Sequence, residues 1–302
     1  AKIDDRMRDI FPPIVEERWS DKTGNRLKDK VTVFNPGSRQ QIASRLTTKY
    51  GWKPPLTNKG NPKVDAAVLK KLDYPEAKEL VNQFDIMKLE SQVADWIKRA
   101  SASRDGRIHG NVNVQGTVTG RMTASQPNMQ QVSGDSRARA LFKPRDGWVQ
   151  VGIDASGLEA RMLANRMAPY DSLEYGKIIL NGDIHEANRK AAGLTNRDQA
   201  KTFFYGLIYG AGNQKIGEIV GKNSWTGGKL KEKFFKNIPA IKKVMDNCAF
   251  QVADKKTITL LDGREVPCRA KHVGLNVQLQ GDGAIVMKLA LCILINKLSK
   301  YK

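Results

Sequence analysis

The sequence predicts a mixed α/β protein that contains both helices and strands. Apolar residues recur at helical spacing through most of the first third, alternate with period two in the middle, and return to helical spacing afterwards. A length of 302 residues allows one large domain or two to three smaller lobes. Hydrophobic residues make up 40% of the chain, which is enough for a packed core and excludes a disordered chain.

The first third is basic and mainly helical. Helical spacing over residues 2–19 is interrupted by Pro12-Pro13, a charged, turn-rich stretch fills 20–30, and 31–34 predict a short strand. Ser38 is a candidate N-cap because its hydroxyl can accept from a free helix amide. The helices expected after it cover residues 40–50, 64–71 and 75–100.

Strands are expected in the middle and helices in the last third. Residues 107–114 and 148–153 predict strands, and glycines from Gly116 to Gly120 allow another backbone to approach closely. A hairpin is expected over 258–266 around Asp262-Gly263, and a final apolar helix from Val273. Charged or polar residues interrupt the apolar run 284–298, so we interpret it as a buried helix and expect no membrane partner.

Charge favours a polyanionic partner. Lys+Arg 51 against Asp+Glu 31 gives a net charge of +20, which most often indicates nucleic acid, although a merely soluble or ribosome-like basic protein is an alternative. Three cysteines and three histidines are too few for a disulfide framework or a histidine-rich metal centre. A reducing, cytoplasmic location is expected. The chain opens without Met or a signal-peptide pattern, so we expect a processed start or a piece of something longer.

A carboxylate stands at the end of the second predicted strand. Asp154 supplies one oxygen and the Ala155 carbonyl can supply another, and such hard oxygen ligands suit Mg²⁺. Ser156 can cap the helix that follows. Asp154 can instead be an N-cap itself, so both interpretations stay open at this point.

Cations and tyrosines recur at one-turn intervals in a second motif. Arg197, Lys201 and Tyr205 stand at i, i+4 and i+8, with Tyr209 at i+12, so the first three share one face of an α-helix. Two cations followed by an aromatic ring can hold a polyphosphate while a base stacks on the ring. The alternative is a solvated basic face with a core tyrosine. The sequence has no Walker-type phosphate loop.

The order of the motifs resembles the family A (Pol I-type) DNA polymerases. The strand ending at Asp154 resembles their motif A, and RDQAKTFFYGLIYGAG resembles motif B, the fingers helix. DGRIHGNVNVQGTVTGRMTASQPNMQQV resembles the primer-template segment, and LDGREVP and LNVQLQGDGAIVMKLA resemble the segment that leads back into the palm. The likeness extends from Phe34 to Leu298 and is greatest to the short replicative polymerases of T7-like phages.

This resemblance implies a right-hand polymerase fold of the α/β (α+β) class, with thumb, fingers and an incomplete palm sheet. The implied divisions are a thumb over 1–103, the first part of the palm over 104–157, fingers over 158–275 with the motif B helix at 197–209, and the returning palm over 276–302.

Site roles are implied residue by residue. Asp154 and the Ala155 carbonyl would hold two catalytic Mg²⁺ ions, with Mn²⁺ as a substitute, and Lys201 would protonate the leaving pyrophosphate. Glu159 would be the steric gate against a ribose 2′-OH, and Tyr205 implies acceptance of dideoxynucleotides. The residues implied to contact the dNTP are Ser156, Gly157, Glu159, His185, Arg197, Lys201 and Tyr205, with Arg197 also catalytic. Those implied to contact primer-template DNA are Arg121, Asn128, Gln131, Tyr209, Asn276 and Gln280.

Two-metal phosphoryl transfer requires a second carboxylate. The family places it in motif C, a His-Asp-Glu hairpin after the helix of Gln280, and the sequence reaches Lys302 without that motif. Asp282 is the nearest acid, and we interpret it as a local variation. We therefore expect a fragment or split subunit whose partners are primer-template DNA, dNTPs and a second polypeptide or C-terminal segment that carries motif C. A phage protein of this kind would act in the host cytoplasm.

Two other functions remain as alternatives. A non-catalytic nucleic-acid-binding subunit would need none of Asp154, Glu159 and Lys201, so their joint presence disfavours it. A single-subunit RNA polymerase shares the logic of motifs A and B, but Glu159 and the T-G-R and Q-P-N segments disfavour it.

Overall fold

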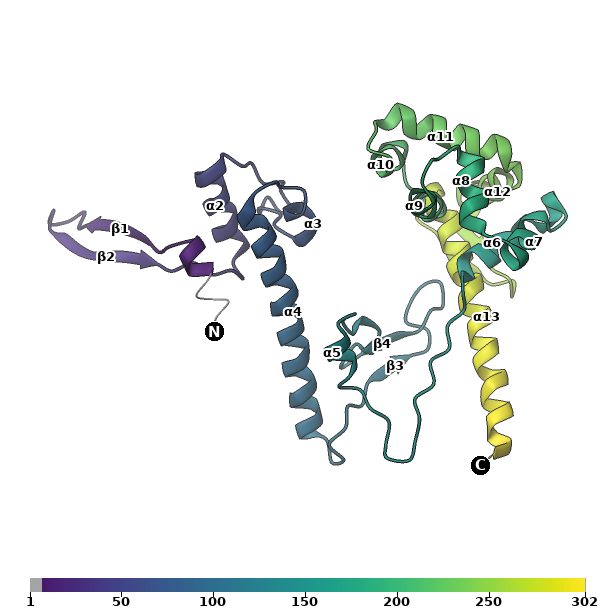
Figure 1. The fold of residues 1–302 in the computed structure, drawn as a ribbon, viewed down its shortest axis with the longest axis horizontal. Coiled ribbons are helices and arrows are strands. Elements are labelled where there is room, and N and C mark those ends of the chain that lie inside the picture. Colours follow the sequence, from purple (N-terminus) through teal and green to yellow (C-terminus); the bar gives the residue numbers. More distant parts are fainter. Residues whose placement is uncertain (1–6, 302) are drawn as a thin grey trace. The chain divides into compact units, whose positions relative to one another are not determined.

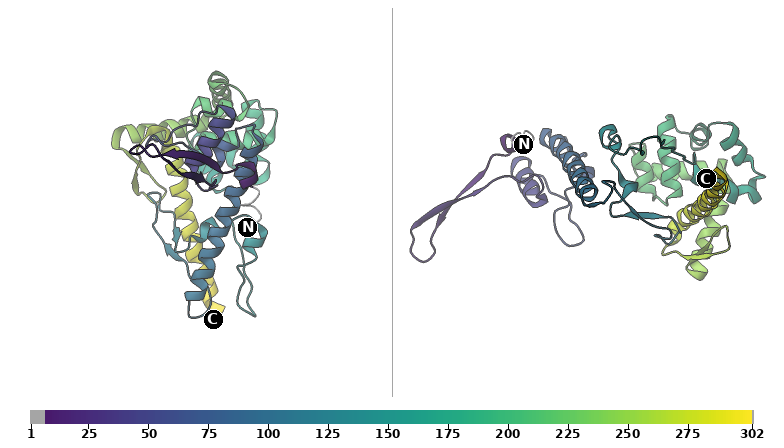
Figure 2. Two further views of the ribbon diagram at one scale, coloured as in Figure 1. Left: turned by 90° about the vertical axis from the view of Figure 1, so that its left-hand side faces the viewer. Right: turned by 90° about the horizontal axis from the view of Figure 1, so that it is seen from below.

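The computed structural model describes residues 7–301 and divides into two compact units, each with its own hydrophobic core (Figures 1 and 2). Unit 1 comprises Ala1–His109 with Gln131–Lys143, and unit 2 comprises Gly110–Gln130 with Pro144–Lys302. The mixture of helices with small sheets confirms the predicted fold class. The division into thumb, palm and fingers stays a prediction.

An antiparallel hairpin of unit 1, β1 (Ile14–Trp19) and β2 (Arg26–Thr32), projects from the helices of this unit (Figures 1 and 2). The helical spacing expected before Pro12-Pro13 is present over residues 7–10. The strand expected over 31–34 was wrong in its bounds, because β2 covers Arg26–Thr32. Both strands lie largely in solvent, so no buried face imposes the apolar alternation by which a strand is recognised.

Three helices of unit 1, α2 (Arg39–Tyr50), α3 (Ala66–Leu69) and α4 (Pro75–Ala102), lie at their predicted positions. The short helix α5 (Ser136–Arg139) was not predicted. Ser38 caps α2 by accepting from the Gln41 amide, as predicted. Phe34, Ile42, Leu46 and Leu80 are at most 3% exposed and form the centre of this unit's core.

Unit 2 is mainly helical. Its first strands, β3 (Asn111–Asn113) and β4 (Thr123–Ser125), pair with each other, and a 3₁₀ turn covers Met129–Gln131. Its helices are α6 (Leu158–Asp171), α7 (Glu174–Asn181), α8 (Ile184–Ala192), α9 (Arg197–Ile208), α10 (Asn213–Ile219), α11 (Ser224–Asn237), α12 (Pro239–Lys255) and α13 (Gly274–Leu298). Short 3₁₀ turns flank α13 at Lys271–Val273 and Ser299–Tyr301.

The core of unit 2 lies among α6, α8, α9, α11, α12 and α13. Phe203, Phe204 and Phe234 are completely buried there. The predicted hairpin is present as β5 (Thr257–Thr259) and β6 (Glu265–Pro267), with Gly263 at φ 82° in the turn. A positive φ of this kind favours glycine because it carries no Cβ.

The predicted strand over 148–153 is absent from the sheets of the described residues. Trp148, Val151 and Ile153 are each more than 70% exposed in an extended segment that leads to α6. Figure 1 draws this connection between α5 and α6 without an arrow. A strand is defined by its hydrogen-bonded neighbour, and none of the described residues pairs with this segment.

The prediction that residues 284–298 form a buried helix was half wrong. They belong to α13, but from Leu289 onward the side chains are exposed, with Leu289 at 60% and Ile295 at 56%. This end extends beyond the other helices of unit 2 (Figure 1). Residues 271–298 have the length and composition of a membrane span, which for one helix is weak evidence, and the first half of α13 belongs to the core.

Candidate functional site

Helix α9 presents one charged and aromatic face and buries the other. Phe203, Phe204 and Leu207 point into the core, whereas Arg197 and Lys201 are exposed and Tyr205 is half-buried. Asn196 begins the helix by accepting from the amides of residues 198 and 199. The structure therefore brings the predicted i, i+4 and i+8 residues onto one accessible face.

Arg197 is already held by a carboxylate. Its Nε lies 2.7 Å from Asp183 Oδ2 and its Nη2 lies 3.1 Å from Oδ1. The hydrogen bond from Arg197 lowers the pKa of Asp183 to about 2. Sequence reasoning missed Asp183, which caps α8 through the amides of residues 185 and 186.

His185 lies near this ion pair and near Tyr205. Its ring centroid is 6.2 Å from that of Tyr205, and its buried Nδ1 has no hydrogen-bond partner in the structure. Burial, followed by the charge of Arg197, lowers the pKa of His185, and Lys201 acts in the same direction. His185 is therefore close to both cations and neutral near pH 7. Among the described residues, no carboxylate pairs with Lys201.

Glu159 belongs to the same cluster. It stands in the first turn of α6 and is half-buried. Burial and then the Glu159 carboxylate raise the pKa of both Tyr205 and Tyr209, whose rings are 6.1 Å apart. The predicted steric gate and the two tyrosines thus meet where α6 and α9 come together.

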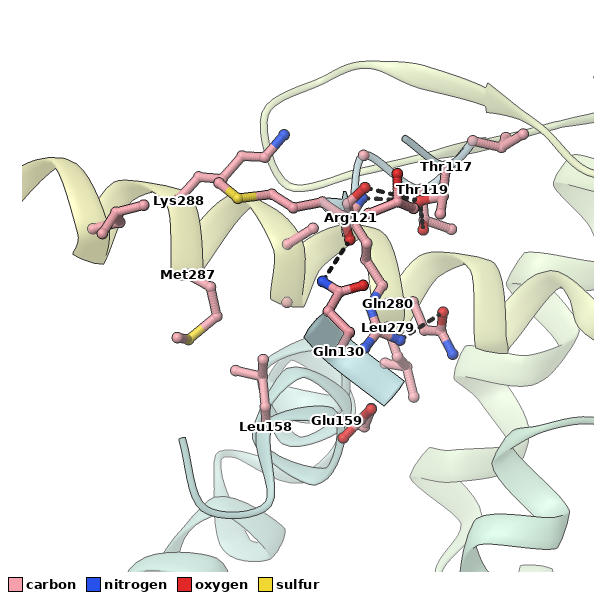
Figure 3. A pocket seen from close by; sticks show the side chains of 17 residues that line it. Thr117, Thr119, Arg121, Gln130, Leu158, Glu159, Leu279, Gln280, Met287 and Lys288 are labelled. Atoms are coloured by element: carbon pink, nitrogen blue, oxygen red, sulfur yellow. Dashed lines mark hydrogen bonds between the residues drawn. The ribbon is translucent and has the colours of Figure 1, made fainter. Parts of the chain in front are cut away.

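A pocket of about 880 Å³ opens beside this cluster (Figure 3). Arg121 crosses it and donates from Nη1 to Gln280 Oε1 on α13 at 3.3 Å. The Arg121 backbone is fixed because its amide donates to Thr117 Oγ1 at 2.9 Å. Glu159 also lines the pocket, as does Gln130, which sequence analysis did not select. The prediction of a DNA contact named the adjacent residue, Gln131, instead of Gln130.

The remaining predicted DNA contacts lie in different places. Asn276 stands one turn before Gln280 on α13, and its Oδ1 is buried without a partner in the structure. Asn128 is exposed in unit 2, where its Oδ1 accepts from the Gln130 amide. Gln131 lies in unit 1, and its carbonyl accepts from Gln92 Nε2 at 2.9 Å.

Metal-ligating groups are sparse. Asp154 is exposed next to the Ala155 carbonyl, which suits one face of a Mg²⁺ ion, but the described residues hold no group of three or more His, Cys, Asp or Glu side chains that could bind a metal. They therefore fit an ion only in part. Both capping expectations here were wrong: Gly157, at φ 60°, is the N-cap of α6, and the Ser156 carbonyl accepts from Arg161 Nε at 2.8 Å.

The chain matches the family model described as DNA polymerase family A over residues 16–302. The chain belongs to this family. Its similarity to the DNA-directed DNA polymerases of Enterobacteria phage T3 and Escherichia phage T7 is 42% identity over 295 residues, 85% of this chain and 42% of each relative. DNA polymerase I of Aquifex aeolicus is 31% identical over 319 residues, 96% of this chain and 54% of the relative.

A solved structure confirms the right-hand polymerase fold. The POL domain of Pol1 from M. smegmatis, in complex with DNA primer-template and dNTP, matches with a TM-score of 0.74 at 21% identity, over 89% of this chain and 52% of that chain. The family A chain thus spans about half the length of the relatives that it matches. The resemblance to family A and to T7-like phage polymerases is confirmed.

Proposed function

We propose that this family A chain carries out template-directed 5′–3′ DNA synthesis, the transfer of a dNTP onto a primer 3′-hydroxyl. The observation that carries the proposal is the accessible face of α9, where Arg197, Lys201 and Tyr205 stand one turn apart beside His185. The spacing suits a triphosphate along the cations and a nucleoside on the ring. A protein of the same fold has been solved with DNA primer-template and dNTP.

Each cation has a different task in this proposal. Lys201 has no carboxylate partner among the described residues, so its ammonium is available to donate a proton to the departing pyrophosphate. Arg197 is bidentate to Asp183, and the guanidinium keeps Nη1 for a phosphate oxygen. His185, kept neutral by its surroundings, adds a hydrogen-bonding nitrogen rather than a third charge. Ser156 and Gly157 border the same nucleotide at the start of α6.

Selection of sugar and base pair falls to the other residues. Glu159 fills the space beside Tyr205 that a ribose 2′-hydroxyl would need, and Tyr205 itself tolerates a missing 3′-hydroxyl. Tyr209 closes the pocket of the template base. Arg121, Asn276 and Gln280 contact minor-groove acceptors that every correct pair presents. Asn128 and Gln131 contact the DNA in the same proposal.

The chemistry proposed is two-metal nucleotidyl transfer with Mg²⁺, or Mn²⁺ in its place, and Asp154 with the Ala155 carbonyl supplies one set of ligands. The second carboxylate comes from a C-terminal segment or second polypeptide with a His-Asp-Glu hairpin. Asp282 is not that group, because it is completely buried and Arg166 binds both of its oxygens. The proposed location of the reaction is the cytoplasm. For a phage protein, this is the cytoplasm of the host cell.

The sparse metal ligands support one alternative, a non-catalytic DNA-binding subunit. Primer extension with labelled primer-template, dNTPs and Mg²⁺ separates the two. We expect extension when a polypeptide with the His-Asp-Glu hairpin is added and none with the chain alone, and Asp154→Ala is the inactive control. Extension by the chain alone would contradict the need for a second piece. DNA binding without extension under both conditions would favour the alternative.

A further inference from the structure

A buried ion pair in unit 2 has no part in the site described above. Asp282 on α13 is completely buried, and Arg166 on α6 is 23% exposed. Arg166 Nε lies 2.7 Å from Asp282 Oδ2, and Nη2 lies 2.8 Å from Oδ1. Such a pair is weak evidence for stability, because burying two charges costs about as much as their attraction returns. We therefore consider which neighbouring groups the pair positions.

The pair holds the β5–β6 hairpin from two sides. The Leu261 amide donates to Asp282 Oδ1 at 2.9 Å, and Arg166 Nη2 donates to the Thr259 carbonyl at 3.3 Å. Gln278, one turn before Asp282, donates to the same carbonyl at 3.2 Å and accepts from the Cys248 thiol. Helices α6, α12 and α13 are therefore tied to one hairpin by buried polar groups.

The turn of this hairpin reaches the pocket of Arg121. The Arg264 guanidinium lies against Gly120, where a Cβ would come within 3.4 Å of Arg264 Nη2. Gly120, at φ 80°, directly precedes Arg121, and Arg121 donates to Gln280 on α13. The contacts thus form a closed ring that runs from Asp282 through the hairpin to Arg121 and back to α13.

The residues of α13 that hold the hairpin and those proposed to contact DNA lie on different faces of the helix. Gln278 and Asp282 are one turn apart on the face that holds the hairpin, while Asn276 and Gln280 are one turn apart on a face rotated by about 200°. A rotation of the helix by about 20° would move side chains roughly 5 to 6 Å from its axis by about 2 Å. Displacements of about 1 Å already impair a positioned group.

We infer that Arg166 and Asp282 are positioning residues that set the rotation of α13, and with it the placement of Gln280, Asn276 and Arg121 against the base pair at the primer terminus. This inference rests on the proposed function, because it assumes that these three side chains contact DNA. It assigns to the pair a role in discriminating matched from mismatched termini rather than in binding DNA as such.

The test uses the full chain with Arg166→Met/Asp282→Asn, which removes both charges, and with Arg166→Lys, which keeps the charge and loses the bidentate geometry. Arg189→Met is the matched control. Arg189 binds both oxygens of Glu186 at 2.7 and 2.8 Å and donates to the Leu194 carbonyl at 2.9 Å, remote in sequence from the pocket residues.

Two readouts are measured. Hydrogen exchange in the free protein should rise over residues 257–283 in both Arg166 variants and stay at the wild-type level there in the control. Fluorescence anisotropy gives the dissociation constants for matched and mismatched primer termini. The dissociation constant for the mismatched terminus divided by that for the matched terminus should fall by about threefold to tenfold in the Arg166 variants, with little change in matched binding. In the control this ratio should stay at the wild-type value.

Wild-type exchange over 257–283 in both variants would overturn the inference, and so would raised exchange with an unchanged ratio. A wild-type chain that fails to distinguish the two termini would contradict the proposed function instead, while the exchange data still decide whether the pair positions α13.

Discussion

Replacing Arg166 by methionine should destabilise unit 2 far more than breaking an exposed ion pair would. Asp282 accepts three hydrogen bonds, and two of them come from Arg166. The substitution leaves a completely buried carboxylate with the Leu261 amide as its remaining partner. Removing one member of a buried pair costs about 3 to 5 kcal/mol, and the 23% exposure of Arg166 places the expected loss near the lower limit.

The Arg189→Met control sets the scale. The side chains of Arg189 and Glu186 are 29% and 35% exposed, so water screens this pair and its loss should cost about 1 kcal/mol or less. In a unit of this size, a difference of about 2 kcal/mol corresponds to a melting-temperature difference of roughly 4 to 8 °C.

Urea unfolding followed by far-ultraviolet circular dichroism measures both variants, with separate transitions fitted for the two units. Arg166→Met should lower the unfolding free energy of one transition by about 3 kcal/mol and leave the other unchanged. Equal stabilities for Arg166→Met and Arg189→Met would refute the reasoning, because the burial of Asp282 would then carry no cost.

Three further predictions concern the site. Lys201→Ala should lower the single-turnover rate of the complemented reaction by about 10² to 10⁴ while changing the primer-template dissociation constant by less than about threefold, and equal losses would contradict its role as a proton donor. Glu159→Ala should relax discrimination between dNTP and rNTP, measured as the ratio of their kcat/KM values, and unchanged rejection of rNTP would remove Glu159 from the gate. The pKa of His185 is lowered from 6.5, chiefly by burial, so the unfolded chain binds its proton at higher pH than the native chain does. The unfolding free energy should therefore fall as the pH drops below 6.5, and His185→Gln should flatten that part of the curve measured by denaturant titration; an identical slope in both proteins would count against it.

Local signals were sufficient for several features in which a residue acts on its own neighbourhood, although the caps expected at Asp154 and Ser156 were wrong. Ser38 was predicted as an N-cap because capping involves amides within three residues, and the Asp262-Gly263 turn was predicted because glycine takes the positive φ. The face of α9 followed from helical periodicity, since Phe203 and Leu207 alternate with Arg197 and Lys201 around the helix.

Sequence could not supply what depends on a distant partner. Residues 148–153 alternate as a strand does, but a strand also needs a hydrogen-bonded neighbour, and none of the described residues provides one. Apolar residues after 288 predict burial, which requires a second surface. Arg166 and Asp282 are 116 positions apart, and a single sequence carries no signal that pairs them.

The exposed apolar end of α13 also determines how the purified chain has to be handled. Leu289, Leu291 and Ile295 are each more than 40% exposed along a helix end that carries apolar side chains on most of its faces. Contiguous apolar surface of a few hundred Å² promotes association between molecules. Light scattering should therefore rise with protein concentration and fall when a mild non-ionic detergent is added. Dissociation constants for DNA should be measured at concentrations where scattering is absent, since aggregates of a basic chain would bind DNA with misleading avidity.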